Sequence, residues 1–538
     1  MIASCRGVPG AAPDTQVTAL NLHPSPPPIL QRWLLALLSA ALLVASFPNF
    51  NQPACAWVAL VPWLLLLRSA TARAAFRWSW LIGVLFFLGS MWWLLHLTAF
   101  GGPAAVLGWV VLSAYLALYF GAFGWFVHRR AFSLQSSAFS VFVVPAAWVA
   151  LEYLRSRLLS GLGWNLLAYS QAPWLSAIQI ADVTGAWGVS FVIVLVNAVL
   201  ADYVGAARDK KTNRQRISRL AVAGGAVLIT LGYGHWRLRA AAGPVLPVRL
   251  AVVQGNIPQA EKWDEERRDE ILEQYGTLTR EAARSRPNLI VWPETSVPGF
   301  LDGDETLTQR VFSLAKAVEV PLLIRSPHAH MEQGDWRITN GAALVHGMRI
   351  AQWYDKLHLV PFGEFVPFER QLPWLRHILP PIGEFVQGRE DTVFQLSEVS
   401  HPSPPFSVLI CFEDLFPDMA RRFVQRGARL LLVITNDAWF GPTAAAYQHA
   451  QASTLRAVEL RVPVARAANT GWSGCIDAAG RWTGSVSGDG GRELFVAGTH
   501  TCELSPGTAD TLYLRWGDWF ALLCLFASAG WLIQARRR

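Results

Sequence analysis

A succession of long apolar runs between residues 33 and 236 is the feature that most constrains this chain. A helix needs about 20 mainly apolar residues to cross a bilayer, with a lower limit near 17. The candidate spans are 33–48, 54–67, 79–98, 104–127, 137–154, 187–205, 220–236 and 516–533. The pattern predicts a membrane α-helical bundle of about eight transmembrane helices. The first two runs are short and also fit a tilted or re-entrant hairpin.

Lys and Arg predict the orientation of this bundle, because cytoplasmic connections carry an excess of both. Basic residues gather in the connections 68–78, 128–136 and 206–219 and in the tail 536–538. The short connections between them, 49–53 and 99–103, carry none. Only the longer segment 155–186 breaks the pattern, with two arginines. We therefore expect both termini in the cytoplasm and the region 248–506 outside it.

Charge and composition argue against a nucleic-acid-binding protein and divide the chain into four segments. The net charge of +8 lies largely in the short basic connections, where it sets topology and meets anionic lipid, so we expect no nucleic-acid partner. Proline enrichment predicts a disordered N-terminal segment. The expected segments are disordered 1–30, transmembrane helices within 31–240, a globular domain at 248–506, and a last transmembrane helix with a basic cytoplasmic tail at 513–538.

The globular region alternates short β-rich runs with amphipathic helical ones, which predicts an α/β layered domain. The expected strands are Val248–Val253, Asn288–Trp292, Pro321–Ile324, Ala342–Val345, Ile350–Tyr354, Leu357–Val360, Ser407–Cys411, Leu430–Thr435 and Val462–Ala468. The expected helices are 263–285, 416–428 and 443–461. About 260 residues are enough for one sizeable core.

Three residues with useful chemistry lie at the ends of such runs. Cys411 ends the apolar run that begins at Ser407, Glu294 follows the run that ends at Trp292, and Lys356 follows a strand-like run. A shared sheet edge would bring them together as nucleophile, base and oxyanion stabiliser, the minimum for acyl transfer through a thioester. The plain alternatives are a buried structural cysteine, a solvated loop acid and a surface lysine.

Further motifs follow in chain order and narrow the hypothesis. They are Val253–Gln259 with Trp263, Trp292–Glu294, Tyr354–His358, Val360–Pro367, Cys411–Glu413 and Asn436–Gly441. Together they resemble the carbon–nitrogen hydrolase (nitrilase) superfamily. With membrane helices on both sides, they are similar to its apolipoprotein N-acyltransferase family. The resemblance covers nearly the whole chain and implies an extracytoplasmic α/β nitrilase-like α-β-β-α sandwich domain.

The resemblance implies a role for each catalytic candidate. Cys411 is the nucleophile, and Glu294 is general base and then general acid. Lys356 stabilises the thiolate and the tetrahedral oxyanion, and the backbone N–H of Phe412 donates to the same oxyanion. Phe412 stands where some relatives carry Tyr, so no side-chain hydroxyl is expected there.

The supporting residues remain open between two interpretations. Glu364 and Glu413 brace the lysine and the nucleophile loop, or are simply salt-bridged. Trp263 lines the acyl pocket or a lid, or is one of the interfacial Trp residues of a membrane protein. Trp439 lines the same pocket or packs in the core.

By resemblance, the reaction moves a fatty acyl chain from a phospholipid to the N-terminal diacylglyceryl-cysteine of an apolipoprotein, with ping-pong kinetics. This implies a phospholipid donor, an apolipoprotein acceptor, a monomer in the bacterial inner membrane with a periplasmic catalytic domain, and no cofactor or metal. The alternatives are a membrane-tethered amidase and a non-enzymatic lipid-binding protein.

Other polar residues are less telling. Glu152, followed by Arg155 and Arg157, fits either a phospholipid headgroup site or an interfacial ion pair. His358 and His449 are expected to be structural. A bridge between Cys475 and Cys502 is possible in an oxidising compartment, but the sequence does not decide it.

Overall fold

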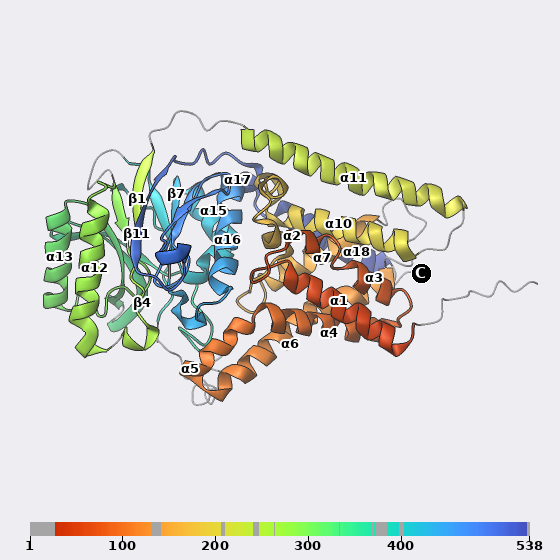
Figure 1. Ribbon diagram of the computed structural model, residues 1–538, viewed down its shortest axis with the longest axis horizontal. Helices are drawn as coiled ribbons and strands as arrows, with labels where there is room; N and C mark the ends of the chain where they lie inside the picture. Colours follow the sequence, from red (N-terminus) through yellow and green to blue (C-terminus); the bar gives the residue numbers. More distant parts are fainter. Residues whose placement is uncertain are drawn as a thin grey trace, which may run out of the picture.

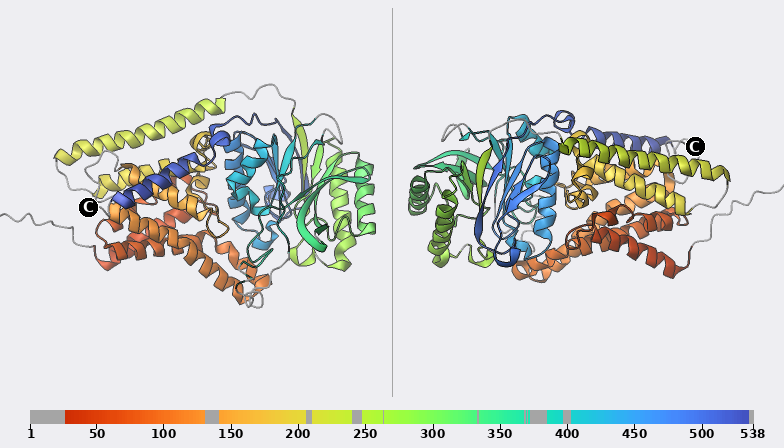
Figure 2. Two further views of the ribbon diagram at one scale, coloured as in Figure 1. Left: turned by 180° about the vertical axis from the view of Figure 1, so that it is seen from behind. Right: turned by 45° about the horizontal axis from the view of Figure 1, so that its top comes forward.

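The computed structural model describes residues 27–130, 141–205, 210–239, 247–262, 264–332, 334–367, 369, 371, 385–396 and 403–534. A helical bundle occupies one end of the molecule and a domain of two β-sheets the other (Figure 1). The same division is seen from behind and from above (Figure 2). Most of the expected disordered segment lies outside the described residues, and the first helix begins at Ile29.

The bundle contains long and short apolar helices. They are α1 (Ile29–Ala45), α2 (Pro53–Ala56), α3 (Val61–Leu67), α4 (Ala72–Ser90), η1 (Trp92–Leu97), α5 (Thr98–Gly101), α6 (Pro103–Arg130), α7 (Val143–Arg155), η3 (Leu167–Gln171), α8 (Leu175–Ile178), α9 (Ala181–Thr184), α10 (Ala186–Gly205), α11 (Lys210–Arg239) and, at the end of the chain, α18 (Trp519–Gln534). α11 runs along the outside of the bundle, from its far end back toward the sheets (Figure 1).

Small residues allow α4 and α6 to pack closely. A Cβ on Gly124 would lie 1.8 Å from Oγ of Ser79, and one on Gly121 would lie 2.8 Å from the ring of Phe76. Helices in a bilayer gain little from hydrophobic burial against each other, so close van der Waals packing through small residues holds them together. Substituting either glycine would push the two helices apart.

The number of helices that meet the length expected for a membrane span is smaller than the eight apolar runs. Within the described ranges, three helices are long and apolar enough to cross a membrane: Pro103–Arg129, Ala186–Gly205 and Arg214–Arg239. Ala72–Ser90 and Trp92–Gly101 make a fourth if this pair, bent by 60°, is one span. The remaining apolar helices, Ile29–Ala45, Pro53–Leu67, Leu175–Thr184 and Trp519–Gln534, are shorter. The count of about eight spans therefore stays a prediction.

The sheet domain consists of two facing sheets. One has the strand order β11-β1-β2-β3-β4-β5 and the other β10-β9-β8-β7-β6. The strands are β1 (Val248–Gln254), β2 (Leu289–Val291), β3 (Leu322–Glu332), β4 (Asp335–His346), β5 (Arg349–Asp355), β6 (Phe406–Ile410), β7 (Leu430–Thr435), β8 (Val464–Ala468), β9 (Gly474–Ile476), β10 (Trp482–Ser485) and β11 (Gly498–Leu504). A disulfide joins Cys475 of β9 to Cys502 of β11 and so links the two sheets.

Helices cover the outer faces of both sheets, which gives the α-β-β-α order. α12 (Arg268–Ala283) and α13 (Glu305–Val318) lie on the side away from the bundle (Figure 1). α15 (Pro417–Gln425) and α16 (Ala445–Leu460) lie on the other side, next to the bundle, and α17 (Leu512–Trp516) leads into α18. The layered α/β prediction is confirmed.

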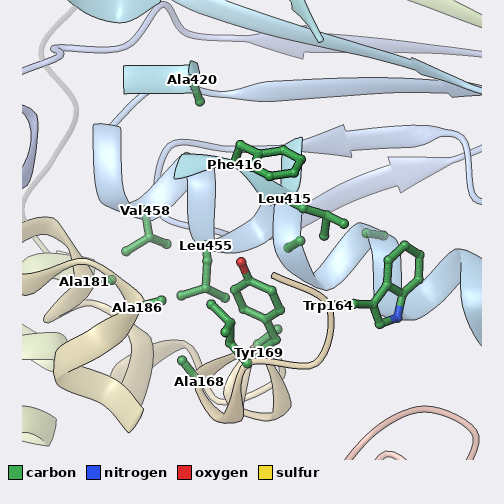
Figure 3. Packing of buried hydrophobic residues seen from close by; sticks show 14 of the residues in the cluster. Trp164, Ala168, Tyr169, Ala181, Ala186, Leu415, Phe416, Ala420, Leu455 and Val458 are labelled. Carbon is green, nitrogen blue, oxygen red and sulfur yellow. The ribbon is translucent and has the colours of Figure 1, made fainter. Parts of the chain in front are cut away.

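α16 connects the domain to the bundle through both apolar and polar contacts. Leu455 and Val458 pack against the segment that carries Ala168 and Tyr169 (Figure 3). Nε1 of Trp93 and Nε1 of Trp164 both donate to Oε1 of Gln448, at 3.1 and 2.8 Å. The amide of Gln448 donates in turn to the carbonyls of Pro48 and Ser90. One side chain thus satisfies four groups of the bundle.

The sequence prediction differs from the structure in particular elements. Leu357–Val360 is not a strand, because the backbone N–H groups of Leu357 and His358 donate to a buried carboxylate instead of to a sheet. The β9, β10 and β11 strands and α13 were not predicted. Strand β3 continues well beyond Ile324, into a polar stretch that sequence pattern alone does not mark.

Candidate active site

Glu294, Lys356 and Cys411 come together at one edge of the sheet domain. Lys356 follows β5 directly, Cys411 follows β6 directly, and Glu294 lies just beyond β2. Nζ of Lys356 is 3.9 Å from Oε1 of Glu294. Lys356 is 1% exposed and Glu294 7% exposed, whereas Cys411 is partly exposed. Glu294 is therefore not a solvated loop acid, and Lys356 is not a surface lysine.

Cys411 occupies a strained turn. It begins the short helix η7 (Cys411–Leu415) with a φ of +57°, a left-handed conformation that disfavours residues with a Cβ. Such strain concentrates at functional sites because the surrounding structure must impose it. Burial, and then the charge of Glu294, raises the pKa of the thiol well above its ordinary value, against the opposing effect of Lys356. The resting group is therefore a thiol that needs a base.

Lys356 is held by a carboxylate other than that of Glu294. Its Nζ lies 2.9 Å from Oε2 and 3.0 Å from Oε1 of Glu364. Burial alone would lower the pKa of Lys356, but the carboxylates of Glu364 and Glu294 outweigh it and raise the pKa. Lys356 therefore remains charged, and its Nζ lies 5.5 Å from the ring centre of Phe412, beside the cysteine.

Asn340 of β4 links the two acids. Its Nδ2 donates to Oε1 of Glu294 at 3.1 Å and to Oε1 of Glu364 at 2.8 Å. Its Oδ1 accepts from Nε of Arg325 at 2.7 Å, which fixes the orientation of the amide. All these side chains are buried or nearly so, and a buried polar network of this kind is rigid when its members are satisfied.

Glu413 joins the cysteine turn to the lysine loop. Its carboxylate accepts from the backbone N–H of Ile410, on one side, and from those of Leu357 and His358, on the other, at 2.7–2.9 Å. The hydroxyl of Tyr354 donates to it as well, at 2.9 Å. Burial raises the pKa of Glu413 to about 7, against the lowering effect of Lys356 and of these donors. Its four donors leave this carboxylate little capacity for chemistry.

A second buried lysine lies behind the site. Nζ of Lys262 donates to the backbone carbonyl of Glu294, to Oγ1 of Thr295 and to Oδ1 of Asn436. Burial lowers its pKa well below the ordinary value. Lys262 thus connects the segment that precedes Trp263, the predicted lid residue, to the segment that carries Glu294. Trp263 itself lies outside the described residues.

Trp439 lies at the contact between the domain and the bundle. It belongs to η8 (Asp437–Phe440), and its ring centre is 4.9 Å from that of Phe100, which is 45% exposed. The neighbouring Phe440 packs edge-on against Trp93 of η1, at 4.5 Å. The structure therefore places Trp439 among aromatic residues of the bundle, beside the cysteine-bearing domain.

The remaining candidates have structural surroundings. Nε2 of His449 donates to Asp414 at 2.8 Å and its Nδ1 donates to Asp437 at 3.3 Å, and both acids are buried. Burial opposes its protonation, but Asp414 outweighs this effect and raises the pKa of His449 to about 9. His358 stacks on Phe416, with ring centres 3.9 Å apart.

Glu152 and the two arginines after it each have structural partners in the fold. Glu152 accepts from the backbone N–H of Leu167 at 2.8 Å, and Arg155 is buried against the carbonyls of Trp164 and Leu162. Arg157 pairs with Asp518 at 2.5 Å and with Asp418. These contacts brace the turn between α7 and η3.

Comparison with known proteins agrees with this geometry. The family model of the carbon-nitrogen hydrolases matches residues 249–497, and that of the apolipoprotein N-acyltransferase N-terminal domain matches residues 39–199. A relative in Geobacter metallireducens, named apolipoprotein N-acyltransferase, is 35% identical over 516 residues, or 94% of this chain and 95% of the relative. The chain belongs to the apolipoprotein N-acyltransferase family.

Further relatives carry the same name. The one from Chlorobaculum tepidum is 32% identical over 476 residues, 84% of this chain and 87% of the relative. Among solved structures, an amidase of the nitrilase superfamily from Nesterenkonia AN1 is 18% identical, with a TM-score of 0.37, over 51% of this chain and 96% of that one. The predicted resemblance to the acyltransferase family is confirmed.

Some site residues of this N-acyltransferase family member were not predicted. Asn340 and Lys262 donate to Glu294, Arg325 orients Asn340, and Tyr354 donates to Glu413. A signal was present for Asn340, because a polar residue before an apolar strand run is costly to bury without a purpose. Nothing in the local pattern marks Lys262, which looks like an ordinary charged residue before a helix.

Proposed function

We propose that this protein moves a fatty acyl chain from a phospholipid to the N-terminal diacylglyceryl-cysteine of an apolipoprotein, through a thioester on Cys411. The observation that carries the proposal is the partly exposed Cys411 in a strained turn, next to a buried Lys356 and Glu294. Membership of the acyltransferase family supports the same reaction.

In the first half-reaction, Glu294 accepts the proton of the Cys411 thiol as sulfur attacks the ester carbonyl of the phospholipid. The ammonium of Lys356 and the backbone N–H of Phe412 stabilise the tetrahedral oxyanion. The intermediate collapses, the carbon–oxygen ester bond breaks, and Glu294 returns the proton to the leaving lysophospholipid oxygen. The acyl group remains on Cys411 as a thioester.

In the second half-reaction, the α-amino group of the apolipoprotein cysteine attacks the thioester. Glu294 accepts the proton that this nitrogen loses, and the same two donors stabilise the second oxyanion. The carbon–sulfur bond breaks, the amide product leaves, and the proton returns from Glu294 to the sulfur. The two half-reactions share one site, which gives ping-pong kinetics.

Four further residues have positioning or lining roles in this proposal. Glu364 compensates the charge of Lys356, so that Glu294 is not consumed in a tight ion pair and remains available as a base. Glu413 keeps the Cys411 turn and the loop after Lys356 in register. Trp439 lines the route between the bundle and the site, and Trp263 contributes a lid over the acyl chain.

The proposed topology has about eight membrane crossings, with 31–240 and 513–538 forming the membrane part and 248–506 the catalytic domain. Arg68 and Arg219, from two basic connections, both pair with Asp202 at one end of α10. At the opposite end, the backbone N–H of Ala186 donates to Glu459 of the catalytic domain. Arg68 and Arg219 thus lie at the end of α10 far from the catalytic domain, which supports cytoplasmic termini under the positive-inside rule.

The disulfide supports the proposed compartment. A structural disulfide persists in an oxidising compartment, and the pairing of Cys475 with Cys502 favours the periplasmic face of a bacterial inner membrane. We propose that the protein acts there as a monomer.

The decisive experiment is intact-mass analysis of the purified protein after incubation with phospholipid vesicles. We expect a mass increase of one acyl group that hydroxylamine removes, and none in the Cys411→Ala variant. Cys55→Ala, which alters a cysteine of the bundle, is the matched control and keeps the adduct. An adduct that survives in Cys411→Ala would overturn the proposal. Release of free fatty acid at the same rate with and without an acceptor peptide would favour a hydrolase instead.

A further inference from the structure

A cluster of metal-ligating side chains includes Asp355, the residue directly before Lys356. His328 and His330 of β3 and Asp355 of β5 each present one ligand atom, and these atoms all lie within 4.8 Å of one another. Residues two apart on a strand point to the same face, which accounts for the two imidazoles. Asp355 is two strands away, because β4 separates β3 from β5.

Gly341 of β4 makes this meeting possible. A Cβ there would lie 2.9 Å from Cβ of His328 and 3.0 Å from the ring of Trp353. The missing side chain lets His328 cross over β4 and stack on Trp353, with ring centres 4.2 Å apart and planes 5° apart. Nδ1 of His328 then reaches Oδ1 of Asp355 at 2.9 Å.

A hydrogen bond from the intervening strand orients the carboxylate of Asp355. Oγ1 of Thr339, on the intervening strand, donates to Asp355 at 2.5 Å, as the partner of a metal-binding carboxylate often does. Nδ1 of His330 is buried and has no hydrogen-bond partner among the described residues. A buried imidazole nitrogen without a partner costs free energy unless something binds it.

We propose that His328, His330 and Asp355 bind a divalent first-row transition metal ion of the zinc class. Two neutral imidazoles and one carboxylate are a common donor set for such ions, and water or a further carboxylate completes the shell. Asp302 faces the other ring nitrogen, with its Oδ2 3.9 Å from Nε2 of His328, where it orients the imidazole. Asp302 and Ala329, the residue between the two histidines, line a surface cavity of about 610 Å³, and the side chains of His328 and Asp355 are themselves partly exposed.

The ion would stiffen the part of the sheet that carries the site. Asp355 immediately precedes Lys356, and Thr339 immediately precedes Asn340, which donates to Glu294 and Glu364. Cross-linking β3 to β5 through the ion would hold the end of β5, and the middle of β4 that lies between the two strands, in place. This inference stands whether or not the acyltransfer proposal is correct, because it rests on other side chains.

The test measures Zn²⁺ binding by isothermal titration calorimetry. The full chain would be purified in detergent without a polyhistidine tag, stripped with a chelator and dialysed. We expect about one ion per chain, and a loss of affinity of at least about tenfold in His330→Ala and in His328→Ala. His346→Ala and His500→Ala, which alter histidines outside the cluster, are the matched controls and keep the wild-type affinity.

A spectroscopic measurement and a folding check complete the design. Co²⁺ added to the stripped protein should give visible absorption bands of a nitrogen- and oxygen-ligated site, and His330→Ala should lose them. The variants' thermal unfolding without metal identifies any that are misfolded. Equal Zn²⁺ affinity in the wild type and in a folded His328→Ala/His330→Ala double variant would overturn the proposal.

Discussion

Nζ of Lys356 lies 2.9 Å from Oε2 of Glu364 but 3.9 Å from Oε1 of Glu294, so the lysine of the site forms its close ion pair with a carboxylate other than that of the base. Both partners of the close pair are nearly inaccessible to solvent. A charge buried in this way needs its partner, because removing one member leaves the other desolvated and unpaired. In this arrangement Glu364 compensates the charge of Lys356, and Glu294 remains available for proton transfer.

Replacing Glu364 by Gln should therefore damage both stability and activity. We expect a loss of about 3 kcal/mol in unfolding free energy, since a buried ion pair is broken. Acyl-enzyme formation should slow as well, because Lys356 would draw Glu294 into a closer pair. Chemical or thermal unfolding in detergent and the rate of the mass increase measure the two effects. Glu273→Gln, which breaks an exposed pair with Arg280, should change stability by less than about 1 kcal/mol.

Asn340→Ala tests whether the amide positions the two acids. The substitution removes the donor to Glu294 and Glu364 and leaves Nε of Arg325 without its acceptor. We expect kcat to fall by about 10²-fold with little change in KM, because a misplaced base affects the chemical step more than lipid binding. Steady-state assays with a fluorescent acceptor peptide give both constants. An unchanged kcat in a stable variant would show that Asn340 is dispensable.

His449 should make stability depend on pH. Its folded pKa of about 9, set by Asp414 against the effect of burial, is above the value of about 6.5 in an unfolded chain. A raised pKa stabilises the folded state fully below pH 6.5, and this contribution is lost as pH rises through about 9. The loss amounts to roughly 3 kcal/mol at most, at about 1.4 kcal/mol per pKa unit. The melting temperature, measured from pH 6 to 10, should fall less steeply in His449→Gln than in the wild type.

The disulfide between Cys475 and Cys502 should contribute measurably to the stability of the catalytic domain. It closes a loop with a sequence separation of 27 residues, for which the chain-entropy estimate is about 3–4 kcal/mol. Cys475→Ala/Cys502→Ala should unfold at a lower temperature, and a reductant should lower the melting temperature of the wild type but not of the variant. Free-thiol counting by mass spectrometry would contradict the pairing if both cysteines were alkylated without reduction.

Gln448→Leu should loosen the contact between the catalytic domain and the bundle. The change removes the acceptor of Trp93 and Trp164 and the donor to two backbone carbonyls. Each buried group left without a partner costs roughly 1–3 kcal/mol. We expect faster proteolysis of the segment around Ser90. Gln425→Leu, which loses one partly buried bond to Leu514 at the edge of the same interface, is the control and should have a smaller effect.

The separation into a membrane part and an α/β domain could be predicted from sequence because it depends on local pattern. Apolar runs of membrane length and short β-rich runs are properties of consecutive residues. The residues Glu294, Lys356 and Cys411 could be found for a similar reason, because each directly follows a recognisable run. Strands β9 and β10 were missed because they have only three and four residues, and β11 because its sequence is mostly polar, so only their pairing partners make them strands.

By itself, the sequence determined which groups are available and at which strand ends they stand. Only the tertiary structure decided which distant groups meet: Lys262 with Glu294, Gln448 with the tryptophans of the bundle, and His328 with Asp355 across Gly341. The physical reason is that hydrophobic periodicity is a local property of the chain. The partner of a buried polar group, by contrast, is chosen by strand order and helix packing over hundreds of residues.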